Sequence, residues 1–150
     1  GMDRPFDSIL EDIAMAPRWQ RLELNDPDLI PPGKALEMAT IDGARALGMD
    51  DRIGSIEVGK DADILLIDLA TPHGMPFVQE SSRIAALARG SDVQTVIVQG
   101  QVLMRDRKVL TVDEADVLEW AQEEALHTLD VFGLAPLTEP SAKHWGHARE

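Results

Sequence analysis

The sequence contains no cysteine, which excludes a disulfide framework and any metal site built on thiolates. It also lacks a long apolar run, because the longest, at residues 64–67, falls far short of the roughly 18–20 residues that span a bilayer. A basic segment followed by an apolar one, typical of a secretory signal, is absent as well. These absences favour a cytoplasmic protein with no membrane partner.

Basic residues are few compared with acidic ones. The chain has 14 Lys and Arg against 27 Asp and Glu, for a formal net charge of −13, and the acidic residues are spread along the sequence. Such a surface repels the phosphates of nucleic acids and of anionic lipids. We therefore expect no nucleic-acid partner.

The length and composition are those of a single globular protein. The chain has 150 residues, of which 44% are apolar and 27% charged. Four stretches follow one another without an internal repeat. They are a helical segment at residues 1–48, a β-rich segment at 49–112, a helix at 113–132 and a loosely ordered tail at 133–150.

Helical spacing of apolar residues appears in the first and third of these stretches. We expect a helix within residues 5–24, which Pro17 interrupts, and a second helix over residues 34–47. A row of small residues on the second helix (Ala35, Ala39 and Gly43) predicts close approach of another backbone. Gly48 suits the left-handed C-terminal cap of that helix, and Asp113 suits the N-cap of the last one.

The middle stretch has strand patterns. Residues 56–58 alternate, residues 62–69 form a near-continuous apolar strand, and residues 93–98 and 102–104 flank a Gln99–Gly100 turn as in a hairpin. A short helix at 82–88 and a short strand at 109–112 complete this pattern.

Three motifs resemble a known family. ATIDGARALG at residues 39–48 and IGSIEVGKDAD at 53–63 are similar to the "ATxxGAxxLG … GSxExGKxAD" signature of the amidohydrolase superfamily. SDVQTVIVQG at 91–100 resembles the closing hairpin of that family. Pro72-His73 and the segment after it look most like the branch of triazine chlorohydrolases and adenosine-type and guanine deaminases.

The resemblance implies an α+β fold. In the family, a (β/α)8 barrel carries the metal, and both ends of the chain build a small β-sandwich. Residues 1–48 would then be late barrel helices, residues 49–112 the C-terminal part of the composite sandwich, and residues 113–132 a helix that returns to the barrel. Gly54 and Gly59 would make turns, and Asp63 would fix a loop by accepting backbone hydrogen bonds.

A barrel of this type needs about 250 residues, so this chain cannot hold one beside a sandwich. The family binds zinc through a His-x-His pair, further histidines and a late aspartate. The four histidines here include no His-x-His pair, and none lies where the family has a ligand. We therefore expect no cofactor in this chain, although zinc serves the full-length family.

The function expected from the resemblance is that of a C-terminal fragment of an enzyme that hydrolyses non-peptide C–N bonds of cyclic amidines. There, a zinc-bound hydroxide attacks a ring carbon and ammonia or another group leaves. The fragment would be inactive alone, with the rest of the enzyme on a separate chain or lost by truncation of the gene. The alternative is a noncatalytic α+β module that self-associates or binds a partner.

Three residues are candidates for metal binding. Asp3 lies about where the family has its metal-binding aspartate, which would also transfer a proton, but the alternative is a frayed terminus. His144 and His147 have a spacing that chelates a metal on a helix, and the alternative is a solvated tail. His73 is interpreted as a loop residue rather than a base.

The expected partner is a second copy of the chain. Without the strands and barrel of the full-length family, the strands here leave an unpaired edge and the helices an apolar face. We expect a homo-oligomer, most simply a dimer, or association with a separate chain that supplies the barrel.

Overall fold

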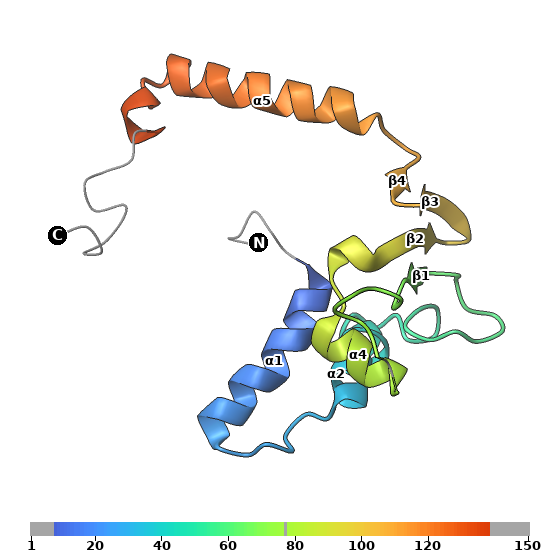
Figure 1. Cartoon of the computed structure of the whole chain (residues 1–150). Coiled ribbons are helices and arrows are strands. Elements are labelled where there is room, and N and C mark those ends of the chain that lie inside the picture. Colours follow the sequence, from blue (N-terminus) through green and yellow to red (C-terminus); the bar gives the residue numbers. More distant parts are fainter. Residues whose placement is uncertain (1–7, 77, 139–150) are drawn as a thin grey trace. The chain divides into compact units, whose positions relative to one another are not determined.

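The computed structural model describes residues 8–76 and 78–138. Two compact units divide the chain between Thr111 and Val112. The first unit contains α1 (Ile9–Leu24), α2 (Pro32–Met38), α3 (Ile41–Ala46), β1 (Ile64–Ile67), α4 (Glu80–Leu87), β2 (Val93–Val98), β3 (Gln101–Arg105) and β4 (Lys108–Val109) (Figure 1). The second contains α5 (Glu114–Val131) and a 3-10 turn (Ala135–Thr138). This mixture of helices with a small antiparallel sheet is the α+β class that was expected.

Helix α1 runs through Pro17, so the predicted interruption there is wrong. Leu10, Ile13 and Pro17 are the buried residues of this helix and lie on one face of it. Proline removes one hydrogen bond of a helix interior, and burial of its ring against the core offsets part of that cost. Packing thus keeps the helix continuous to Asn25, which caps it in a left-handed conformation.

The single helix predicted over residues 34–47 is also wrong, because the structure has two helices, α2 and α3, separated at Ala39 and Thr40. Thr40 has φ −124° and ψ −98°, and its hydroxyl donates to the carbonyl of Leu36 at 2.7 Å. Such a side-chain bond competes with the helical ladder. The predicted row of small residues therefore does not form, and the nearest neighbour of a Cβ on Gly43 would be the Met38 carbonyl oxygen at 3.2 Å.

Both predicted helix caps are confirmed. Gly48 has φ +67°, its amide donates to Arg45, and the Met49 amide donates to Ala44, which is the Schellman pattern. At the start of α5, the Asp113 carboxylate accepts from the amides of Ala115 and Asp116 at 3.0 and 3.4 Å.

The four strands form one antiparallel sheet in the order β1-β2-β3-β4. The predicted hairpin is confirmed: Gln99 and Gly100 both have positive φ, at 49° and 78°, which matches the right-handed twist of the strands they join. The strand predicted at 62–69 is limited to β1, and the last strand lies at Lys108–Val109 instead of 109–112.

Residues 56–58 do not form the predicted extended segment of the sheet. They belong to a loop in which Ile56 and Val58 are 83% and 108% exposed, so their alternation reflects no buried face. Within the described ranges, β1 pairs only with β2 and β4 only with β3, so both are edge strands.

The apolar core of the first unit is small. Helices α1, α2 and α4 pack against one another (Figure 1), and the sheet contributes Val93, the first residue of β2. The buried core residues are Leu10, Ile13, Ala35, Ala85, Ala88 and Val93. No side chain of the described residues is completely buried, and Trp19 and Leu22 of α1 remain 64% and 82% exposed.

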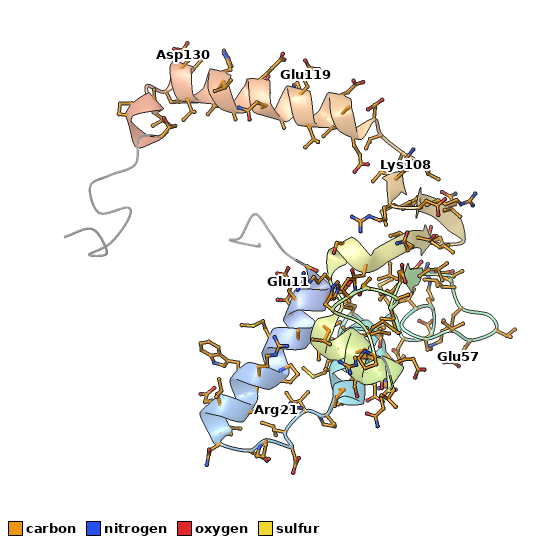
Figure 2. The ribbon with its side chains drawn as sticks, viewed as in Figure 1. Glu11, Arg21, Glu57, Lys108, Glu119 and Asp130 are labelled. Atoms are coloured by element: carbon orange, nitrogen blue, oxygen red, sulfur yellow. The ribbon has the colours of Figure 1, made fainter. Side chains whose placement is uncertain are left out.

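Charged side chains are distributed over the elements, as the sequence predicted. Figure 2 shows Glu11 on α1, Glu57 in the loop before β1, and Glu119 and Asp130 on α5. Among residues 8–76 and 78–138, no helix combines the length and the apolar character that crossing a bilayer requires.

Candidate functional site

The metal-ligand candidates Asp3, His144 and His147 lie outside the described residues. Within the described ranges, no three His, Cys, Asp or Glu side chains gather closely enough to hold a metal ion. The strongest cluster of chemically reactive groups is a pair, His73 and Asp92.

The His73–Asp92 pair joins the loop after β1 to the 3-10 turn Gly90–Asp92 that precedes β2. His73 Nε2 lies 2.8 Å from Asp92 Oδ2, and the same carboxylate oxygen accepts from the Arg89 amide at 2.8 Å. The side chain of Asp92 is only 6% exposed, while that of His73 is 27% exposed. The pair therefore consists of a buried acceptor and a donor at the surface.

The pKa of Asp92 lies below its ordinary value. Burial acts to raise this pKa, but the hydrogen bonds from His73 and from the Arg89 amide, together with the charge of His73, outweigh it and favour the carboxylate. An ionised Asp92 accepts a hydrogen bond from Nε2–H of His73, which orients the imidazole. Such a pair can hold a loop in place, and nothing else in the described residues supplies it with a nucleophile or a metal.

The residues of the two signature motifs make turns and pack against each other. Gly54 has φ +89°, and a Cβ placed on it would lie 2.7 Å from the Cβ of Ala44 and 2.9 Å from the Cα of Ile41. Gly59 has φ +98° in the following turn. The turns predicted at Gly54 and Gly59 are thus confirmed, and Gly54 also allows close packing against α3.

Lys60 holds the loop between these two glycines. Its side chain is 11% exposed, and Nζ donates to the Asp50 carbonyl at 2.5 Å and to Ser55 Oγ at 2.7 Å. The Ser55 hydroxyl in turn donates to Glu57, and this bond, followed by the charge of Lys60, lowers the pKa of Glu57. Because Nζ of Lys60 is hydrogen-bonded to these acceptors, the side chains of Lys60, Ser55 and Glu57 have a structural role and stabilise the loop.

Asp63 fixes a turn, as predicted, but the turn is a distant one. Its Oδ1 accepts from the Gln99 amide at 2.7 Å, and the neighbouring Gly100 amide donates to the Ala62 carbonyl at 3.0 Å. Asp63 therefore anchors the tip of the β2–β3 hairpin to the start of β1.

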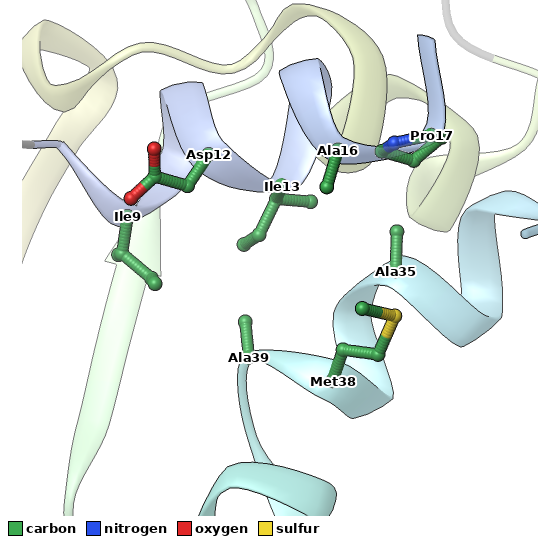
Figure 3. A pocket seen from close by; sticks show the side chains of 8 residues that line it. All are labelled: Ile9, Asp12, Ile13, Ala16, Pro17, Ala35, Met38 and Ala39. Carbon is green, nitrogen blue, oxygen red and sulfur yellow. The ribbon is translucent and has the colours of Figure 1, made fainter. Parts of the chain in front are cut away.

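A cavity of about 170 Å³ lies between α1 and α2. Figure 3 shows Ile13 and Ala16 of α1 facing Ala35 and Met38 of α2 across it, with Asp12 at its edge. Among the described residues that line it, Asp12 is the only ionisable one. An apolar cavity with one peripheral carboxylate lacks the convergent polar groups of a catalytic site.

The sequence profile of the amidohydrolase family matches residues 1–103. The chain belongs to the amidohydrolase family. It is 43% identical over 123 residues to a 5-methylthioadenosine/S-adenosylhomocysteine deaminase of Desulforudis audaxviator, a match that covers 82% of this chain and 29% of that protein. It is 38% identical over 117 residues to a 5'-deoxyadenosine deaminase of Methanosarcina acetivorans, covering 78% of this chain and 27% of that one.

Solved structures of this amidohydrolase family share the fold. A zinc-bound adenosine deaminase from Xanthomonas campestris matches with a TM-score of 0.74 at 31% identity, covering 77% of this chain and 26% of its own. Atrazine chlorohydrolase from Arthrobacter aurescens, complexed with zinc, matches with a TM-score of 0.66 at 25% identity, covering 76% and 25%. The chain thus spans less than a third of the length of these relatives.

The zinc of those relatives does not fit the described side chains of this amidohydrolase chain. A catalytic zinc takes three protein ligands and keeps one open position. His73 and Asp92 are bonded to each other, and no third ligand lies with them in the described ranges.

Sequence reasoning assigned His73 to a loop and did not single out Asp92. The pairing of residues 19 apart in sequence depends on the course of the intervening chain, which no local pattern reveals. The sequence feature that could have pointed to Asp92 is its position directly before the apolar residues of β2, because a charge buried there needs a partner.

Proposed function

We propose that this chain forms the C-terminal share of an amidohydrolase that deaminates an adenosine-type substrate. In this reaction, water adds to the amino-bearing carbon of the purine ring and ammonia leaves. The observation that carries the proposal is the 43% identity to an adenosine-type deaminase over 123 residues. The fold match to a zinc-bound adenosine deaminase at a TM-score of 0.74 supports it.

The catalytic groups, in this proposal, come from residues outside this sequence, on the same polypeptide or on another. The absence of a metal-binding cluster in residues 8–76 and 78–138 supports this division. The signature residues support it as well, because their contacts are structural. Gly54 packs against Ala44, Lys60 donates a hydrogen bond to Ser55 within its own loop, and Asp63 accepts from the Gln99 amide at the β2–β3 turn. The chain alone then has no hydrolytic activity.

The architectural part of the proposal assigns α1, α2 and α3 to the late barrel and the sheet to a composite sandwich. Among the described residues β1 is an edge strand, which supports this role because its outer row of backbone groups can pair with further strands. Leu65 and Leu66 of β1 are 46% and 52% exposed, which leaves apolar surface for another layer to cover.

A noncatalytic module that self-associates is the second candidate. The observation that favours it is the amount of apolar surface on the first unit, which includes Trp19 and Leu22 of α1 as well as the exposed leucines of β1. A second copy would cover that surface in the same way as the rest of an enzyme.

A complementation assay separates these two functions. The chain is mixed or co-expressed with the part of the Desulforudis audaxviator deaminase that lies outside the matched 29%, and ammonia release from 5-methylthioadenosine is measured with zinc present. Each part alone is the control. We expect activity only in the mixture.

Two results would refute the proposal. Deamination by the chain alone would place the catalytic groups within it. A mixture that forms a stable complex and remains inactive would favour the noncatalytic module.

A further inference from the structure

Asp92 is the single charged side chain that is buried among the described residues, and it holds the segment after β1 at two places. The carbonyl of Asp92 accepts from the Asp68 amide at 2.8 Å, and its carboxylate is 2.8 Å from His73 Nε2. We call residues 68–76 the strap. The strap is thus fastened to one residue through both main chain and side chain.

The strap is folded within itself. The Ala70 amide donates to Asp68 Oδ1 at 2.8 Å, and the amides of Gly74 and Met75 both donate to the Thr71 carbonyl, at 3.0 and 2.9 Å. A Cβ on Gly74 would lie within 2.4 Å of the Leu69 carbonyl oxygen, so the segment doubles back tightly. These contacts keep the strap compact whether or not it stays attached to Asp92.

The strap contributes no side chain to the apolar core of the first unit. Ala70, Pro72 and Met75 are exposed, whereas the core comes from α1, α2, α4 and the sheet. Segments with few buried apolar contacts open at a lower free energy than the core around them. Besides the main-chain bond from Asp68 to Asp92, the attachment that closes the strap is therefore the contact between His73 and the Asp92 carboxylate, a charge-assisted hydrogen bond.

We propose that the strap opens as one unit when the contact between His73 and Asp92 is broken, while the helices and the sheet stay folded. The hydrogen bond between His73 and Asp92 thus holds the strap in its closed conformation. This role is independent of the deaminase function proposed above.

Hydrogen exchange of the full chain, measured by mass spectrometry, tests whether the contact between His73 and Asp92 holds the strap closed. Three variants are compared with the wild type: His73→Ala removes the donor, His73→Gln keeps an amide donor, and Asp92→Asn removes the charge. His127→Ala, a change at an exposed histidine of α5, is the matched control.

In His73→Ala, we expect exchange in peptides covering 68–76 to rise about 10- to 100-fold, the range for loss of a hydrogen bond to a charged group. Peptides of α1 and β2 should keep their wild-type rates, and His73→Gln and Asp92→Asn should show smaller rises confined to the strap. The control should match the wild type throughout.

Three outcomes would overturn the proposal. Unchanged exchange in the strap would mean that the contact does not hold it closed. Faster exchange across α1 and β2 as well, or failure of His73→Ala to fold while Asp92→Asn folds with an unaltered strap, would make the pair an ordinary part of the core.

Discussion

Gly54 lies directly against Ala44, so that a Cβ on Gly54 would stand 2.7 Å from the Cβ of Ala44. Ala44 belongs to the first half of the family signature and is 3% exposed, and Gly54 begins the second half with φ +89°. The two halves of the signature therefore pack directly against each other. In this chain, residues of the amidohydrolase signature thus form a packing contact between α3 and the loop that follows it.

Gly54→Ala should destabilise the chain by about 1–3 kcal/mol, because the new methyl group overpacks the contact and alanine disfavours positive φ. Urea denaturation checks this. Gly33→Ala is the matched control, since a Cβ on Gly33 of α2 meets nothing within 4 Å. The control should be neutral or more stable by up to about 1 kcal/mol, as for other helical glycines. Equal effects of the two substitutions would contradict the packing role.

The stability that Asp92 contributes should depend on pH in the acid range. Its folded-state pKa is below the ordinary value of 3.8, so ionised Asp92 stabilises the fold at pH values above that. The contribution is lost as the pH falls from about 4 through the lower folded-state pKa. Urea titrations should show the wild type more stable than Asp92→Asn at pH 7, by a margin that shrinks below pH 4. A margin that is constant down to pH 2 would show that the carboxylate charge is not involved.

Features with a local cause were predicted from the sequence. The Gly48 cap, the Asp113 cap and the Gln99–Gly100 turn each depend on backbone preferences within a few residues, and each is present. The superfamily was recognised for the same reason, because its signature consists of such residues.

Features that depend on the contacts of particular side chains were not predicted. Pro17 stays helical because its ring is buried, and the chain breaks at Thr40 although the apolar pattern continues across it. The partner of His73 could not be inferred, since it depends on how the strap folds back to Asp92. Tertiary contacts override local propensity at Pro17, whereas the break at Thr40 accompanies the local hydrogen bond from its hydroxyl to the Leu36 carbonyl.

We predict that the purified chain retains no stoichiometric zinc after dialysis. A hydrolytic zinc normally takes three protein ligands, and residues 8–76 and 78–138 hold no group that could provide them. Elemental analysis measures the content. A value near one zinc per chain would contradict the prediction and direct attention to Asp3, His144 and His147. Substitution of each of these residues by alanine, with the zinc content measured again, would then identify the ligands.

The chain by itself should form a discrete oligomer, most simply a two-fold dimer. The position of β1 at the edge of the described sheet and the exposed Leu65, Leu66 and Trp19 favour association. The net charge of −13 limits open-ended aggregation. Sedimentation at micromolar concentration measures the mass. A compact monomer of 16.5 kDa would contradict the prediction. Lysine in place of Leu66 should shift the equilibrium toward monomer, and lysine in place of the strap residue Ala70 is the control.

The central proposal is that this chain can serve as one share of an adenosine-type deaminase, and a chimera tests it most directly. The chain replaces the matched 29% of the Desulforudis audaxviator deaminase in a single polypeptide, and the rate of ammonia release from 5-methylthioadenosine is measured with zinc present. We expect a folded chimera that deaminates this substrate at a rate well above that of a version carrying Gly54→Ala, in which the contact between Gly54 and Ala44 is disturbed. A chimera that folds, binds zinc and releases no ammonia would contradict it.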